Sequence, residues 1–323
     1  MTTGADSVSD FLSGMRRGTV PAAPVPAGTA AAPPVAKRPA PKTRAPKTPA
    51  VAPLPSPGVV SRPGGGVYYP RALGPHADVA ALRKCREAVP VLPVLLYGLP
   101  GNGKTALAEA AFSDVLTVNG SAETEVGDFV GTFVQTEDNT IRWIDGPLVQ
   151  AMEEGWPLLI DEVALIDPRV MSVVYSAMDG RNEIVVTSNP ARGTVKAQPG
   201  FYVIAGCNPN APGAQMSEAL LSRFLIHIEV PSDYDLAKTL GVDSRVIKIA
   251  KNLTEKLKSG EVSWAPQLRE LVGHRRVCEV LGEETAARNL VALAPESDRE
   301  IVAGVVSTVF GMPIAALTLG GQV

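Results

Sequence analysis

Residues 91–105 read VLPVLLYGLPGNGKT, an apolar run that leads directly into a glycine-rich loop. The run Val91–Tyr97 predicts a short strand buried on both faces. Gly98–Thr105 has the spacing G-x-x-x-x-G-K-T, and the pattern of Gly103–Phe112 predicts a helix after it. A strand, loop and helix in this order are typical of a loop whose backbone N–H groups surround a phosphate chain.

This loop is therefore expected to bind a nucleotide. Its glycines let the backbone curl, and the N-terminus of the following helix adds partial positive charge. Lys104 is expected to reach the β- and γ-phosphate oxygens, and Thr105 to offer its hydroxyl to Mg²⁺. A glycine-rich turn with an incidental lysine is the alternative interpretation. The expected nucleotide-binding residues are Gly98, Pro100, Gly101, Asn102, Gly103, Lys104, Thr105 and Ala106.

A second apolar run, Leu158–Ile160, ends in the two acids Asp161 and Glu162. We expect Asp161 to hold the Mg²⁺ through a water, and Glu162 to polarise the water that attacks the γ-phosphate. Two acids after a strand can also be an ordinary exit into a loop. In a sheet that carries a phosphate-binding loop, the pair favours ATP hydrolysis.

A third predicted strand, Phe201–Ala205, leads into Asn208, whose side chain could hydrogen-bond the attacking water or the γ-phosphate. A plain Asn-Pro turn is the alternative. Further along, Arg223 precedes the apolar run Phe224–Val230. An arginine there is usually solvated, but it could also be an arginine finger that reaches the γ-phosphate of a neighbouring subunit.

The order of predicted elements indicates two folded parts. Short apolar strands alternate with helices such as Pro168–Met178, which predicts a parallel α/β sheet over residues 67–232. Residues 233–323 show helical patterns alone and are expected to form a small all-α lid domain. The expected helices of this lid are 233–240, 244–259, 266–281, 283–293 and 296–309.

Residues 1–66 are expected to be a disordered basic arm rich in Pro and Ala. Residues 20–63 hold 13 of the 29 prolines, a composition typical of an extended linker. Residues 11–77 contain nine Lys or Arg and no Asp or Glu, whereas residues 78–323 contain 21 bases and 31 acids. A short docking helix at 8–15 or a frayed tail are both compatible with the first residues.

Several classes are excluded by composition. There is no run of 18 apolar residues, and the N-terminus lacks the apolar region of a secretory signal, so neither a membrane span nor secretion is expected. Three widely spaced cysteines and three histidines make a disulfide framework or a His-rich metal site improbable. A reducing cytoplasm is therefore expected.

Taken together and in this order, these motifs resemble those of an AAA+ ATPase, most closely the MoxR-like branch with the CbbQ, NorQ and gas-vesicle GvpN types. The resemblance covers roughly residues 67–310. Besides the motifs above, it rests on Tyr69-Pro70-Arg71, Glu123–Gly131, Trp143–Gly155, Asp179-Gly180-Arg181 and Pro199-Gly200-Phe201.

The resemblance implies two β-hairpin inserts, at 131–146 and 183–197, that engage a client protein; purely local roles are the alternative. It also implies that Arg269 is the lid arginine that senses the γ-phosphate, with a lid salt bridge as the alternative. The branch usually has Ser-Thr-Arg or Ser-Pro-Arg there, whereas this chain has Gln267-Leu268-Arg269.

The expected function is a Mg²⁺-dependent ATP hydrolase that forms a ring, a hexamer by resemblance, and remodels, activates or assembles a partner protein. A partner with a von Willebrand factor A domain is the first expectation. One alternative is a DNA-associated motor that uses the basic arm, although this arm has no interleaved aromatics for base stacking. A slow nucleotide-gated scaffold is another, and a small-molecule kinase fits least.

Overall fold

The computed structural model describes residues 58–137 and 139–320. The docking helix expected at 8–15, and the arm up to residue 57, lie outside the described residues. Within the expected arm, β1 (Val60–Ser61) pairs antiparallel with β2 (Val67–Tyr68). Within the described residues, backbone pairing thus begins at Val60, before Val67.

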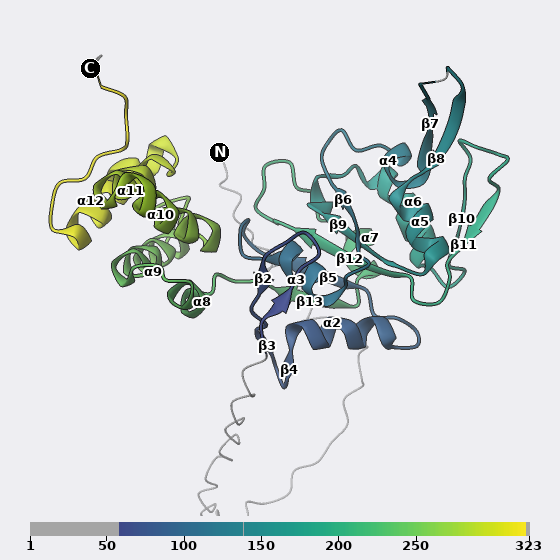
Figure 1. Ribbon diagram of the computed structural model, residues 1–323, viewed down its shortest axis with the longest axis horizontal. Coiled ribbons are helices and arrows are strands. Elements are labelled where there is room, and N and C mark those ends of the chain that lie inside the picture. Colours follow the sequence, from purple (N-terminus) through teal and green to yellow (C-terminus); the bar gives the residue numbers. More distant parts are fainter. Residues whose placement is uncertain (1–57, 138, 321–323) are drawn as a thin grey trace, which may run out of the picture. The chain divides into compact units, whose positions relative to one another are not determined.

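A five-stranded sheet forms the centre of the first folded part (Figure 1). All four pairings in it are parallel, as the alternation of strands and helices predicts. The strand order is β13-β5-β12-β9-β6. The strands are β5 (Val94–Tyr97), β6 (Leu116–Asn119), β9 (Pro157–Asp161), β12 (Tyr202–Cys207) and β13 (Ile226–Glu229).

Both faces of this sheet are covered by helices. In β5, Val94 and Leu96 pack into the core beneath one face, while Leu95 packs into the core of the other. Strands buried on both sides need apolar residues at every position, which is why they appear in the sequence as unbroken runs. One face carries α2 (Asp78–Glu87) and α3 (Lys104–Ala111); the other carries α4 (Val126–Val130), α5 (Pro147–Glu154), α6 (Pro168–Met178) and α7 (Glu218–Arg223).

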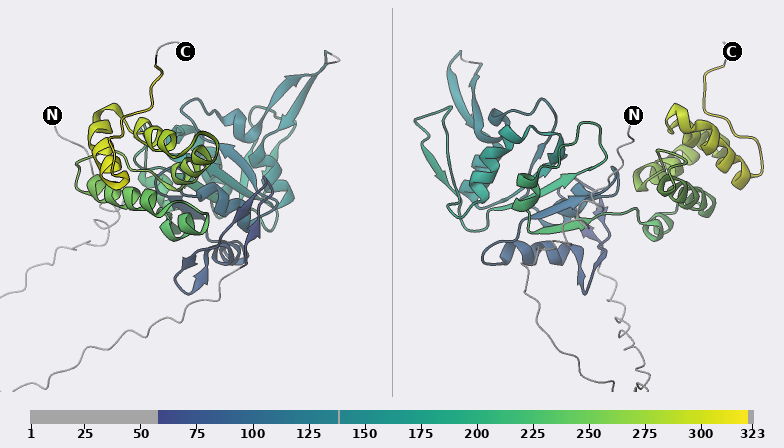
Figure 2. Two further views of the ribbon diagram at one scale, coloured as in Figure 1. Left: turned by 60° about the vertical axis from the view of Figure 1, so that its left-hand side comes forward. Right: turned by 180° about the vertical axis from the view of Figure 1, so that it is seen from behind.

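The two expected hairpins are present. The first pairs β7 (Gly131–Gln135) with β8 (Ile141–Asp145), and it extends away from the sheet in both Figure 1 and Figure 2. The second pairs β10 (Glu183–Val185) with β11 (Thr194–Lys196). A further short hairpin, β3 (Ala72–Leu73) with β4 (His76–Ala77), precedes α2.

Beyond β13 the described chain is helical, as expected, and has its own apolar core. Its helices are α8 (Tyr234–Thr239), α9 (Ser244–Lys258), α10 (Leu268–Leu281), α11 (Glu283–Ala292) and α12 (Arg299–Phe310). The last predicted helix is divided, because a 3₁₀ turn, η2 (Glu296–Asp298), follows Pro295 before α12 begins. No helix in the described ranges is long and apolar enough to cross a membrane.

The parallel arrangement brings three loops to one edge of the sheet. Loops that follow the carboxyl ends of β5, β9 and β12 emerge at the same edge of the sheet. Polar residues far apart in sequence meet there.

Candidate functional site

The loop after β5 has the backbone that its glycines allow. Gly98, Gly101 and Gly103 all have positive φ angles, of 144°, 83° and 91°. The Lys104 ammonium donates to the carbonyl of Gly98 (2.9 Å) and to that of Leu99 (3.2 Å), so it spans the mouth of the loop. Since α3 begins at Lys104, the first N–H groups of this helix, which have no partner within the helix, face the same loop.

The two folded parts meet at this loop. A Cβ added to Gly101 would lie 2.7 Å from Cβ of Arg269, a residue in the first turn of α10. The absence of a side chain at Gly101 therefore lets Arg269 approach the loop backbone. Sequence reasoning could place Arg269 in the lid, but only the tertiary structure sets it beside the loop.

Thr105 and Asp161 are in direct contact. The Thr105 hydroxyl donates to Oδ2 of Asp161 at 2.6 Å, which joins the start of α3 to the end of β9. On the neighbouring strand β12, a Cβ added to Gly206 would lie 2.7 Å from Oδ1 of Asp161. Gly206 is a residue that the sequence analysis missed; its signal was a glycine at the end of a buried strand, where another chain segment approaches closely.

Glu162 and Asn208 are also brought together. Glu162 adopts the left-handed conformation (φ 49°), which is uncommon outside glycine, and its Oε2 accepts from the backbone N–H of Asn208 at 3.2 Å. The side-chain oxygen of Asn208 accepts from the N–H of Asn210. The Asn-Pro turn that was the alternative is therefore present together with the contact to Glu162.

The electrostatics of the site are those of a buried cation among acids. Burial lowers the pKa of Lys104, and the carboxylates of Glu162 and Asp161 partly offset that effect. Burial raises the pKa of Cys207, at the end of β12, to about 12. Cys207 therefore stays protonated at neutral pH and is no nucleophile.

These residues fit a nucleotide with Mg²⁺. The glycines of the loop carry no side chains, Lys104 would supply a positive charge, and the adjacent oxygens of Thr105 and Asp161 are of the kind that Mg²⁺ prefers. No group of three or more His, Cys, Asp or Glu that could hold a metal occurs within the described ranges. Mg²⁺ usually takes one or two ligands from the protein and the remaining ones from phosphates and water.

Arg223 lies elsewhere. With Ser222, it lines a hollow of about 1630 Å³ that is also bordered by Pro93 and Phe201, the residues just before β5 and β12. This is the amino end of the parallel strands, opposite the phosphate loop. The guanidinium rests over the ring of Tyr175, 5.5 Å from its centroid.

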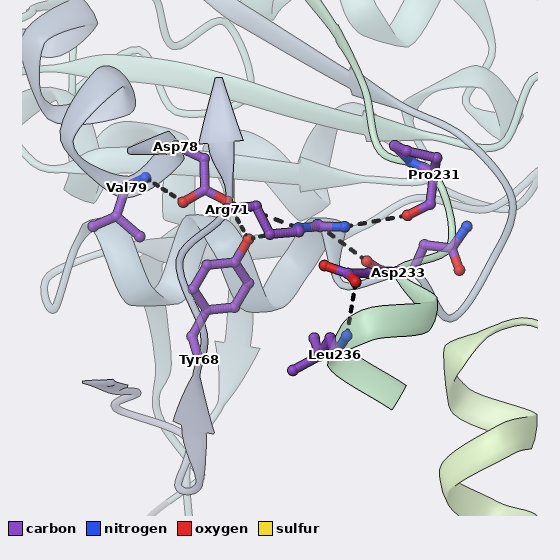
Figure 3. A network of polar contacts seen from close by, with 8 residues as sticks. Tyr68, Arg71, Asp78, Val79, Pro231, Asp233 and Leu236 are labelled. Atoms are coloured by element: carbon purple, nitrogen blue, oxygen red, sulfur yellow. Dashed lines mark hydrogen bonds and ion pairs between the residues drawn. The ribbon is translucent and has the colours of Figure 1, made fainter. Parts of the chain in front are cut away.

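A second polar network, around Arg71, borders the site (Figure 3). Tyr68 donates to Asp78 at 2.5 Å, and Arg71 Nε donates to the Tyr68 hydroxyl. From there Arg71 reaches the carbonyl of Pro231 (3.2 Å) and, in the phosphate loop, that of Asn102 (3.3 Å). The sequence showed Arg71 only as part of the resemblance and gave no indication of these contacts.

Residues 93–224 match the family model described as an AAA domain of the dynein-related subfamily. This range begins just before β5 and ends just after Arg223, so it includes the loop, both acids and Asn208.

Similar chains occur in staphylococci. An uncharacterized protein of Staphylococcus epidermidis strain RP62A is 33% identical over 230 residues, which are 64% of this chain and 86% of that protein. An uncharacterized protein of Staphylococcus haemolyticus is 31% identical, with the same coverage. Among solved structures, a candidate ATPase from Cytophaga hutchinsonii matches with a TM-score of 0.38 and 13% identity over 74% of this chain and 89% of its own.

Proposed function

Because this chain belongs to the AAA ATPases, with an AAA domain of the dynein-related subfamily, we propose that it works as a ring that remodels a partner protein. The chain binds nucleotide and is an ATPase. The observation that carries the site assignment is the contact between Thr105 and Asp161, which sets a nucleotide-loop hydroxyl against a strand-end carboxylate.

In the proposed site, Lys104 binds the β- and γ-phosphate oxygens in place of the loop carbonyls it now contacts. Thr105 would hold Mg²⁺ with its hydroxyl, and Asp161, whose Oδ2 lies 2.6 Å from that hydroxyl, would hold it through a water. When bound, Mg²⁺ neutralises phosphate charge as the γ-phosphate is transferred to water.

Glu162 serves as the general base. Its carboxylate accepts the proton of the attacking water, and the Asn208 N–H, 3.2 Å from Oε2, limits where the carboxylate can turn. Asn208 orients the same water or the γ-phosphate with its side chain. Arg269, in van der Waals reach of Gly101, senses the γ-phosphate from the helical domain.

Arg223 supports a ring. It lies at the opposite end of the sheet from the loop of its own chain, so it completes a site only if it reaches a neighbouring subunit. We propose a hexamer in which Arg223 of each subunit offsets charge at the next nucleotide.

The hairpin β7–β8 supports contact with a partner protein. Phe133, Ile141 and Ile144 on it are exposed by 53%, 71% and 51%. Apolar side chains exposed on a projecting hairpin are suited to contact with another protein, and a von Willebrand factor A domain is the partner we propose.

The cysteines Cys85, Cys207 and Cys278 are free thiols, which is compatible with a reducing compartment, and we propose the cytoplasm.

Mixing two inactive variants tests this proposal. Lys104→Ala should lose nucleotide binding, and Arg223→Ala should bind ATP without turnover. Mixed rings should regain activity, because an intact loop of one variant meets an intact Arg223 of the other. Absence of any recovery, with both variants assembled on size-exclusion chromatography, would reject action between subunits.

A further inference from the structure

Asn102 occupies one of the unspecified positions of the G-x-x-x-x-G-K-T motif, yet its side chain is only 3% exposed and is fully engaged. Its Nδ2 donates to the Val230 carbonyl (3.3 Å) and to Oε1 of Gln267 (3.1 Å), and its Oδ1 accepts from the Ser232 hydroxyl (3.0 Å). These partners lie 128 to 165 residues further along the chain. Asn102 thus ties the phosphate loop to two distant segments.

The first segment is the connector between β13 and α8, residues 230–233. Arg71 donates to the Pro231 carbonyl of the same connector (Figure 3). It also donates to the Asn102 carbonyl of the phosphate loop. The side chain of Asn102 thus contacts the connector directly, and its carbonyl is linked to the connector through Arg71.

The second segment is the start of α10. Gln267 immediately precedes this helix and is 6% exposed. Its Nε2 donates to the Ala265 carbonyl (2.9 Å), which turns Oε1 toward Asn102 and Ser232. In this orientation Oε1 accepts from the Asn102 amide and is placed to accept from the Ser232 hydroxyl as well. We call Asn102, Ser232 and Gln267 the polar bridge.

The hydroxyl of Ser232 gives the polar bridge two arrangements. It is within hydrogen-bond distance of both Oδ1 of Asn102 and Oε1 of Gln267. A hydroxyl has one proton to donate, so it serves one of these acceptors at a time. The Ser232 hydroxyl can therefore bond either the loop residue Asn102 or the helical-domain residue Gln267.

Arg269 lies two residues after Gln267, and its Cβ lies beside Gly101. Its position at the loop thus follows from where the polar bridge holds the beginning of α10. We infer that Asn102, acting through Gln267, is a positioning residue that sets where Arg269 stands at the phosphate loop. The effect on hydrolysis rests on the proposed function; the mechanical link between loop and helix does not.

The link itself is tested by amide hydrogen exchange without nucleotide. The Leu271 N–H donates to the Gln267 carbonyl and so reports the first turn of α10. Asn102→Ala, a change in the α/β part, should speed exchange of this amide about tenfold, as loss of one buried hydrogen bond would. Gln267→Met removes the contact with Asn102 and also the capping contact of the Gln267 side chain with the N3 backbone of α10, so its effect should be at least as large. Adding Asn102→Ala to Gln267→Met should then change exchange little further. Asn252→Ala, at an exposed position of α9, is the matched control and should leave the amide unchanged. Unchanged exchange in Asn102→Ala would overturn the inference.

The effect on hydrolysis is tested by combining variants. Asn102→Ala should lower kcat about tenfold while the Kd of a fluorescent ADP analogue stays within about threefold, because Lys104 and the loop backbone remain. Adding Arg269→Ala to Asn102→Ala should lower kcat by no more than about a further twofold, because both changes remove the contribution of Arg269 to hydrolysis. Multiplicative losses would overturn action through Arg269. Failure of the proposed function would appear differently, as an inactive parent protein or as nucleotide binding that survives Lys104→Ala.

Discussion

Arg192 Nε lies 3.0 Å from Oδ1 of Asp145, and this ion pair connects the two β-hairpins. Arg192 belongs to the loop between β10 and β11, and Asp145 ends β8. The same guanidinium pairs with Glu153 of α5, and the Trp143 ring N–H donates to Asp145 at 2.7 Å. The two inserts, expected from the sequence as separate features, are thus held to each other and to α5.

Removing Arg192 should therefore loosen both hairpins. In Arg192→Ala we expect faster amide exchange in β10–β11 and a stability loss of about 1 kcal/mol, the range for partly exposed ion pairs. Arg181→Ala is the control, since the Arg181 guanidinium forms its ion pair with Asp179 of the same turn and does not connect the two hairpins in the described part of the chain. If both variants exchange alike in β10–β11, the two hairpins are independent.

The pair also predicts an acid response. Burial alone would raise the pKa of Asp145, but hydrogen bonds from Arg192 and Trp143 outweigh it and lower that pKa. The stability it contributes is present above the ordinary carboxyl pKa of about 4 and is lost as the pH falls toward the lower folded value. Asp145→Asn should flatten this part of the melting-temperature profile below about pH 5. If the melting temperature of Asp145→Asn depended on pH as that of the parent protein does, the pair would not be the source of this acid response.

The stability of the helical domain should depend on pH in a range closer to neutrality, because of His274. Burial lowers the pKa of this side chain, Asp243 and Glu283 oppose that effect, and Arg245 adds to it. Its neutral form is thus favoured in the folded state, so stability is full above pH 6.5 and declines as the pH falls below that value. His274→Leu should remove this decline in thermal melts. His76→Leu, at an exposed position, should keep it.

Gly206 should be needed for magnesium-dependent turnover. A methyl group there would lie 2.7 Å from Asp161 Oδ1 and push the carboxylate away from Thr105. In Gly206→Ala we expect kcat to fall about 100-fold, the loss of one positioned catalytic group, with ADP affinity in EDTA nearly unchanged. Gly127→Ala, where an added Cβ meets nothing within 4 Å, is the control. If turnover by Gly206→Ala depended on Mg²⁺ concentration in the same way as turnover by the parent protein, this assignment would be contradicted.

Glu162→Gln should separate binding from chemistry. The amide keeps the shape but cannot take a proton, so turnover should fall by about 10²–10⁴-fold while ATP affinity persists. Glu154→Gln, on the exposed side of α5, should hydrolyse ATP normally. Hydrolysis by Glu162→Gln at the parental rate would mean that another group is the base.

Much of the fold was predictable because its signals are local. The apolar run ending at Tyr97 predicts β5, although the strand starts at Val94, three residues later than Val91, because Pro93 cannot donate a ladder hydrogen bond. The helix Pro168–Met178 was predicted with its ends, because Pro168 and the Asp167 side chain, which accepts from the Arg169 N–H at 2.7 Å, form a recognisable helix start.

The order and spacing of residues alone specified the phosphate loop, the strand-end acids and the succession of α/β and helical parts. These depend on backbone conformation and apolar periodicity within a few neighbouring residues. Only the tertiary structure decided that Asn102 meets Gln267, that Gly206 makes room for Asp161, and that Arg192 binds Asp145. Contacts across dozens of residues depend on how strands and helices pack, and an asparagine, a glycine or an arginine carries no mark in the sequence of the partner that packing will bring to it.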